Sequence, residues 1–128
     1  MGQAAERTKE MTEALVNAHA ELTGDFSPVH VDEAAAKQTR FGTRIAHGML
    51  SAGFLSATIG MDLPGPGTVW VVQTFKFKQP VKLGDTITWR VEVKELFAEK
   101  KRARLSTVAR NQRREVVIEG EGTVLLLE

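Results

Sequence analysis

The stretch HGMLSAGFLSATIG (residues 47–60) decides the fold, because it is apolar on every side of a helix. A helix that is apolar all round is stable only when other parts of the protein enclose it. Small glycine, serine and alanine residues recur along this stretch, so another element can pack very close to its backbone. The sequence therefore predicts a buried central helix.

The segments after this helix read as β-strands. The turn cluster MDLPGPG (61–67) ends the helical region, and strand-like segments follow at 68–81, 86–97, 98–111 and 115–128. The segment 86–97 alternates cleanly, with Ile87, Trp89, Val91 and Val93 on one face. These segments predict about four long antiparallel strands, which curve around the helix and supply its cover.

Two further helices are expected before the central one. Residues 12–24 form a helical pattern that Thr12 caps and Gly24 ends, and residues 31–39 form a short helix capped by Asp32. The chain would thus begin with helices and end with strands. This order predicts an α+β fold.

The composition limits the class of protein. The chain has 128 residues, of which 42% are hydrophobic, so residues 1–128 are expected to form a single domain. A net charge of +1 gives no reason to expect nucleic acid as a partner. The absence of cysteine excludes disulfides and cysteine-based metal sites.

We also expect no membrane partner and a cytoplasmic location. The N-terminal residues 1–15 are charged and lack the apolar core of a secretory signal. The long apolar stretch at 45–61 holds three glycines and is short for a membrane span.

The first candidate site is the pair Asp25 and His30. Pro28 fixes its own φ and biases Ser27 toward an extended backbone, so the segment that joins the pair is stiff. A stiff turn can hold a carboxylate and an imidazole on one water molecule, with histidine as the proton carrier. The alternative, at least as common, is an Asx turn at Asp25 and a loop histidine without catalytic function.

The second candidate site is Gly48, at the start of the buried helix. The first N–H groups of a helix have no internal partner, and a residue without a side chain lets a carbonyl oxygen approach them. Gly48 could therefore be an oxyanion donor, or it could simply ease helix packing. His47 is interpreted as a structural capping residue and His19 as a partly buried helix residue. The histidine spacing matches no helical metal motif, so no metal is expected.

Together these segments resemble the MaoC-like dehydratases, and most closely the (R)-specific enoyl-CoA hydratases of the hot-dog fold. The resemblance rests on LTGDFSPVHVDEAAAKQTRFGTRIAHGML (22–50), with support from GPGTVWVVQTFKFKQPVKLGDTI (65–87). The first block is similar to that family's Gly-Asp-x-Asn-Pro-x-His core, followed by Phe-Gly-x-x-Ile-x-His-Gly-Met. The likeness extends over roughly residues 12–128.

The resemblance implies an antiparallel sheet wrapped around a buried central helix, a homodimer, and an acyl-CoA thioester as substrate. The implied reaction is the reversible syn addition of water to a trans-2-enoyl thioester, without a cofactor or a metal. The catalytic pair of the family falls on Asp25 and His30, its oxyanion amide on Gly48 and its active-site serine on Ser56. The chain departs from the family at Ser27, where asparagine is usual, so hydrogen bonds at the catalytic turn are expected to differ.

Two other functions share this fold. An acyl-CoA thioesterase would attack the carbonyl carbon, and many such enzymes carry an acid on the central helix. No Asp or Glu occurs between Glu33 and Asp62, which argues against that class. A non-catalytic acyl-CoA-binding module would need the pocket but not the pair, so the presence of both Asp25 and His30 disfavours it.

Overall fold

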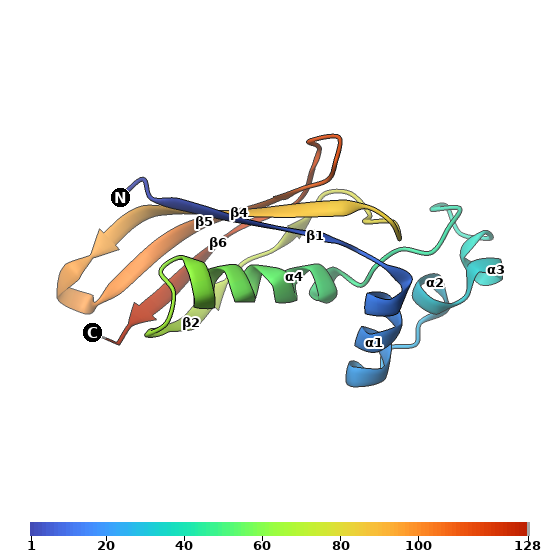
Figure 1. The fold of residues 1–128 in the computed structure, drawn as a ribbon, viewed down its shortest axis with the longest axis horizontal. Helices are drawn as coiled ribbons and strands as arrows, with labels where there is room; N and C mark the ends of the chain where they lie inside the picture. The colour runs from blue at the N-terminus through green and yellow to red at the C-terminus, as the bar shows by residue number, and fades with distance from the viewer. Residues whose placement is uncertain (128) are drawn as a thin grey trace.

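The computed structural model describes residues 1–127, which form one antiparallel sheet with helices on one side of it (Figure 1). The six-stranded sheet has the order β1-β4-β5-β6-β2, and β3 pairs with β6. Its strands are β1 (Ala4–Glu10), β2 (Thr68–Gln73), β3 (Lys76–Phe77), β4 (Thr86–Phe97), β5 (Arg102–Arg110) and β6 (Val116–Leu126). The α+β prediction is confirmed. Glu128, the last residue of the predicted final strand, lies outside the described residues.

The central helix α4 (Gly48–Ala57) packs against one face of the sheet and continues as a π-helical turn, Thr58–Asp62. Its small residues let β4 approach the helix backbone. The buried indole N–H of Trp89 donates a hydrogen bond to the Ser51 carbonyl at 2.7 Å. Leu55 and Ile59 enter the same core as Trp89 and Leu105. The predicted helix therefore forms, and close helix-to-sheet contact explains its composition.

The expectation that the chain encloses this helix on all sides is wrong. Ser51, Ala52 and Leu55 are buried, but Gly53 and Ser56 are exposed, as is Met49 with 58% of its surface accessible. A single sheet covers only one side of a helix, and in Figure 1 β1, β4 and β5 lie above α4, with β2 beside its C-terminal end. The opposite, partly apolar side of α4 is left uncovered by residues 1–127.

The expected order of helices first and strands afterwards is also wrong, because the chain begins with strand β1. This strand pairs with β4 from Ala4 opposite Glu92 to Glu10 opposite Thr86, at the edge of the sheet. Nearly all of its residues are exposed, so it lacks the apolar alternation that marks a strand with one buried face. Charged side chains are common on edge strands, where they discourage pairing with other chains.

The segment 68–81, predicted as one strand, is two strands. Both β2 and β3 pair with β6, and the chain is irregular between them. Gly120 and Gly122 of β6 make room for this irregularity. A Cβ on Gly120 would lie 1.9 Å from the Thr74 carbonyl oxygen, and one on Gly122 would lie 2.3 Å from Gln73 Oε1.

Three helices gather near the N-terminal end of α4, and they carry the candidate site (Figure 1). They are α1 (Glu13–Thr23), α2 (Pro28–Val31) and α3 (Glu33–Ala36). The predicted caps are confirmed, since the Thr12 side chain accepts from Leu15 N–H and Gly24 ends α1 with φ 83°. Asp32 likewise caps α3 through Ala35 N–H.

A buried arginine ties these helices to the segment that leads into α4. Arg44 is 6% exposed, and its Nε donates to the His30 backbone carbonyl at 2.6 Å. Its terminal nitrogens reach Glu13 of α1 at 2.6 Å and Asn17 of α1 at 2.9 Å. One guanidinium thus links α1, α2 and the approach to α4. Among residues 1–127, no helix has the length and hydropathy needed to cross a membrane.

Candidate active site

Asp25, in the turn between α1 and α2, lies next to His30, in the single turn of α2. Gly24 ends α1 in the left-handed conformation, and Pro28 occupies the first turn of α2, where its fixed φ suits a helix start. This brings the Asp25 carboxylate and a ring nitrogen of His30 within 4.8 Å of each other. The stiff turn expected from the sequence does place the two side chains side by side.

Ser27 holds the Asp25 carboxylate. Its hydroxyl donates to Asp25 Oδ1 at 2.7 Å, and its backbone N–H donates to the same oxygen at 3.1 Å. These hydrogen bonds are the main reason that the pKa of Asp25 lies below its usual value, and the nearby His47 and His30 lower it further. The carboxylate is therefore a stable anion. Its Oδ2 can accept a hydrogen bond from another group. Ser27 thus gives Asp25 two hydrogen bonds, and how they differ from those of the family's asparagine stays a prediction.

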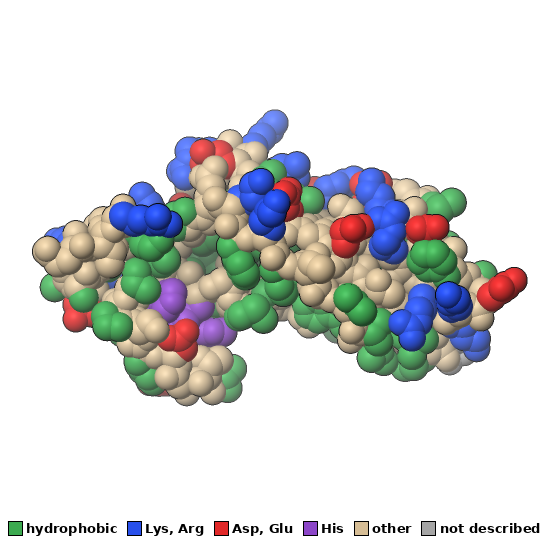
Figure 2. Space-filling view, turned by 180° about the vertical axis from the view of Figure 1, so that it is seen from behind, with side chains coloured by type: hydrophobic (Ala, Val, Ile, Leu, Met, Phe, Trp, Pro, Cys, Tyr) green, Lys and Arg blue, Asp and Glu red, His purple; other side chains and the backbone are tan. Residues whose placement is uncertain are grey.

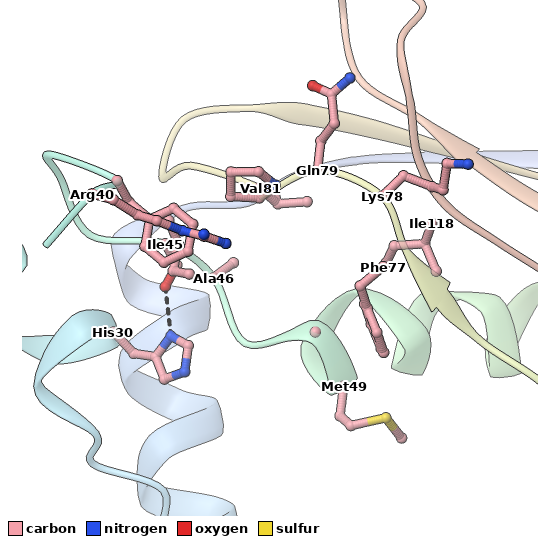
Figure 3. A pocket seen from close by; sticks show the side chains of 13 residues that line it. His30, Arg40, Ile45, Ala46, Met49, Phe77, Lys78, Gln79, Val81 and Ile118 are labelled. Carbon is pink, nitrogen blue, oxygen red and sulfur yellow. Dashed lines mark hydrogen bonds between the residues drawn. The ribbon is translucent and has the colours of Figure 1, made fainter.

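The His30 ring is oriented by the segment that precedes α4. Its Nδ1 lies 2.8 Å from the Ile45 carbonyl oxygen (Figure 3). A carbonyl oxygen only accepts, so Nδ1 carries the hydrogen and Nε2 is the free nitrogen of the neutral ring. Nε2 can then accept a hydrogen bond or a proton.

Gly48 and His30 line the same pocket, which has a volume of about 470 Å³. Its walls are mainly apolar, with Ile45, Met49 and Phe77 among them, while Arg40 and Lys78 lie at its sides (Figure 3). Within residues 1–127, the N–H of Gly48 at the start of α4 has no hydrogen-bond partner. The pocket thus combines an apolar space with an imidazole ring and, among the described residues, an unpartnered helix N–H.

Phe77 gives a second reason for a glycine at position 48. A Cβ there would lie 2.6 Å from Cε1 of the Phe77 ring, which is far too close. The ring of Phe77 therefore lies directly against Gly48. Both the oxyanion interpretation and the packing interpretation of this glycine remain consistent with the geometry.

The interpretation of His47 as a structural capping residue is wrong for its side chain. His47 occupies the N-cap position of α4, but its side chain makes no capping hydrogen bond. Instead, its ring contacts those of His30 and His19, with centroid separations of 4.0 and 4.4 Å. Figure 2 shows the histidines gathered in a hollow of the surface, next to an acidic side chain. The spacing of the three histidines in the sequence offered no signal for this cluster.

Asp25, His30 and His47 offer donor atoms within 4.8 Å of one another, and such a set can hold a zinc ion in other proteins. However, the rings of His30 and His47 are stacked at an angle of 27°. The lone pairs of imidazole lie in the ring plane, so two nearly parallel rings cannot direct them at one ion. The stacking of the two rings thus disfavours a metal ion shared by His30 and His47.

Ser56, the fourth predicted site residue, does not join this cluster. It lies roughly two turns beyond Gly48 on the exposed side of α4, and it has no hydrogen bond with Asp25 in the described chain. Its role in the site stays a prediction.

Comparisons with known proteins identify the family of this chain. The family model of the MaoC like domain matches residues 1–117. The (R)-specific enoyl-CoA hydratase of Rhodospirillum rubrum is 49% identical over 125 residues, covering 98% of this chain and 86% of that protein. The 3-hydroxybutyryl-CoA dehydratase of Methylorubrum extorquens is 47% identical over 116 residues, covering 91% of this chain and 73% of that protein.

A solved structure extends the likeness to three dimensions. The unliganded R-hydratase PhaJ1 of Pseudomonas aeruginosa superposes with a TM-score of 0.94 at 44% identity, covering 100% of this chain and 82% of that one. The sheet with its central helix is therefore the hot-dog fold. By sequence and by structure, this chain belongs to the MaoC-like dehydratase family.

Proposed function

We propose that this protein is an (R)-specific enoyl-CoA hydratase, a hydro-lyase that adds water reversibly to a trans-2-enoyl thioester. The observation that carries the proposal is the placement of Asp25 and His30 on one turn, beside a pocket that also contains Gly48. The relatives at 47–49% identity are named as a hydratase and a dehydratase of acyl-CoA thioesters, which supports the same reaction.

In the proposed mechanism, Asp25 and His30 bind one water molecule beside C3 of the enoyl group. The Asp25 anion and the free Nε2 of His30 accept hydrogen bonds from this water, and the pair takes up its proton as the oxygen attacks C3. A proton from the pair then reaches C2. Because donor and acceptor share one turn, both parts of water arrive on the same face, and the addition is syn.

The oxygen of the thioester gains negative charge when C3 is attacked. In the proposal, the free N–H of Gly48 meets this charge, supported by the positive end of the α4 dipole. Removing one such donor costs an enzyme about 10²–10³-fold in rate. A positioned acid or base contributes typically 10²–10⁴-fold. Ser56 is retained as a proposed substrate-binding residue on the same helix.

The remaining candidates are weaker. A thioesterase that relied on an acid of the central helix would need a carboxylate on α4, and α4 carries none. A binding module without catalysis would not need Ser27 to hold an ionised carboxylate beside a free imidazole nitrogen.

We further propose that the enzyme is a homodimer. The uncovered side of α4 and the edge strand β2 expose Met49, Met61, Val69, Val71 and Val72, with accessible fractions of 40–62%. Apolar groups at an unpaired edge favour association with a second copy. An acyl-CoA substrate implies a role in fatty acid metabolism, for which we propose a cytoplasmic location.

Incubation with crotonyl-CoA tests the proposal. The expected result is loss of the conjugated enoyl thioester without release of free thiol. Release of free CoA would instead identify a thioesterase. Saturable binding without turnover would identify a binding module.

A further inference from the structure

We infer that His47 is a positioning residue for this reaction, whose buried ring sets the geometry of Asp25 and His30 together. The inference rests on the proposed function and adds a residue with no role assigned above. Two separate contacts carry it: a hydrogen bond to the backbone of Asp25 and a ring stack on His30.

The hydrogen bond fixes the loop that carries Asp25. Nε2 of His47 lies 3.0 Å from the backbone oxygen of Asp25, a residue 22 positions earlier in the chain. Since a carbonyl oxygen only accepts, Nε2 carries the hydrogen. The start of α4 is thereby attached to the turn between α1 and α2, and the carboxylate of Asp25 is held relative to Gly48.

The ring stack fixes the other member of the pair. His47 lies against the face of His30, whose edge is held by the Ile45 carbonyl. One contact in the ring plane and one on the ring face leave His30 little freedom to rotate. His47 is 3% exposed, so other residues enclose its ring on nearly every side.

The surroundings of His47 favour its neutral form. Burial is the main cause that lowers its pKa, and the neighbouring His30 and His19 lower it further. The Asp25 carbonyl and the Asp25 charge act in the opposite direction but do not reverse the shift. These groups come from α1, α2 and the turn between them, which are the elements packed around the ring. Its Nδ1 is buried without a hydrogen-bond partner in the described chain.

A neutral His47 suits the proposed proton transfer. When His30 takes up the proton of water, it becomes a cation stacked on a neighbouring ring. A neutral aromatic face tolerates such a cation, whereas a second charged imidazole at 4.0 Å would oppose it. His47 thus supports the pair without exchanging protons itself.

Three variants separate the two contacts in the hydration assay. His47→Ala removes both, His47→Gln keeps an N–H donor, and His47→Phe keeps a ring. We expect His47→Ala to lower kcat by about 10²-fold with KM within roughly threefold, since small misplacements of reacting groups have effects of this size. His47→Gln and His47→Phe should each recover part of that loss. His19→Gln is the matched control, because His19 contacts the same ring from α1, and it should keep kcat within about threefold.

A folded His47→Ala variant with the kcat of the parent would overturn the inference. It would also be overturned if all four variants, His19→Gln included, lost kcat equally and in proportion to their loss of melting temperature.

Long-range ¹⁵N–¹H spectra of the parent test the inference without any variant. We expect His47 to be the neutral tautomer with hydrogen on Nε2 at pH 7, and a charged ring or hydrogen on Nδ1 would contradict the inference. A parent inactive on crotonyl-CoA would refute the proposed function, while the spectra still decide the state of His47.

Discussion

At the scale of single residues, the account depends on an anionic carboxylate beside a free imidazole nitrogen. Asp25→Asn removes the anion while keeping the shape, and His30→Ala removes the proton carrier. Each should reduce the kcat of hydration by at least about 10²-fold and leave the melting temperature within a few degrees. Steady-state kinetics and thermal melting on the same preparation check this. A kcat within threefold of the parent in either variant would show that the pair is misassigned.

Ser27 lowers the pKa of Asp25, which in the proposed mechanism must be ionised. Its hydroxyl is the largest cause of the lowered pKa of Asp25, so the carboxylate stays ionised to lower pH than usual. Ser27→Ala should raise that pKa. Because Asp25 would then be protonated at a higher pH, the fall of kcat/KM on the acid side of its pH profile (the acid limb) should move to higher pH. Ser27→Thr keeps a hydroxyl and should keep the limb near its original position. An unchanged limb in Ser27→Ala would mean that another group controls it.

Part of this site could be predicted from the sequence, because Asp25 and His30 belong to one short segment with a proline between them. His47 could not be assigned, since its contact with Asp25 spans 22 positions and depends on how α4 meets the turn. The hydrogen bond from Ser27 likewise depends on a rotamer that spacing does not reveal. Local stiffness is encoded in a few residues, whereas contacts across elements require the fold.

At the scale of elements, the start of α4 can be tested for its proposed oxyanion function. Gly48→Ala alone is ambiguous, because its Cβ would clash with Phe77. The double variant Gly48→Ala/Phe77→Leu relieves the clash, with Phe77→Leu as its control. We expect the double variant to remain about 10²-fold below that control in kcat/KM, because the new methyl group blocks the approach to the N–H. Recovery to the level of the control would show that Gly48 only accommodates the Phe77 ring.

Arg44 joins the helices that carry the pair to the approach of α4. Arg44→Met should lower the free energy of unfolding by about 2–3 kcal/mol, because it leaves the His30 carbonyl and Asn17 without their donor. Chemical denaturation measures this. Arg110→Met, at an exposed arginine of β5, should change stability by less than about 0.5 kcal/mol. Equal effects of the two substitutions would contradict the structural role of Arg44.

Elements were predictable where a cap or an alternation marks them. The caps at Thr12, Gly24 and Asp32 located two helices, and the apolar face of residues 86–97 located β4. Strand β1 carries neither signal, because its side chains face solvent and its order comes from pairing with β4. The division of 68–81 into β2 and β3 depends on Gly120 and Gly122, which are distant in sequence.

At the scale of the whole molecule, the uncovered side of α4 makes association the natural expectation. We predict a homodimer at micromolar concentration by light scattering. Val71→Lys/Val72→Glu on the edge strand β2 should shift it toward the monomer and reduce activity. Val72 and Val71 are 55% and 40% exposed in the single chain, so the isolated fold should survive these changes. A fully active monomer would rule out the dimer.

The central claim is that one turn delivers both parts of water to the same face of the substrate. Hydration of crotonyl-CoA in D₂O tests it directly, since the product records the configuration at C3 and the position of deuterium at C2. The account predicts the (R)-3-hydroxy thioester, with deuterium and hydroxyl added syn, when the product is analysed by NMR and chiral separation. An (S) product, or anti placement of deuterium, would contradict it.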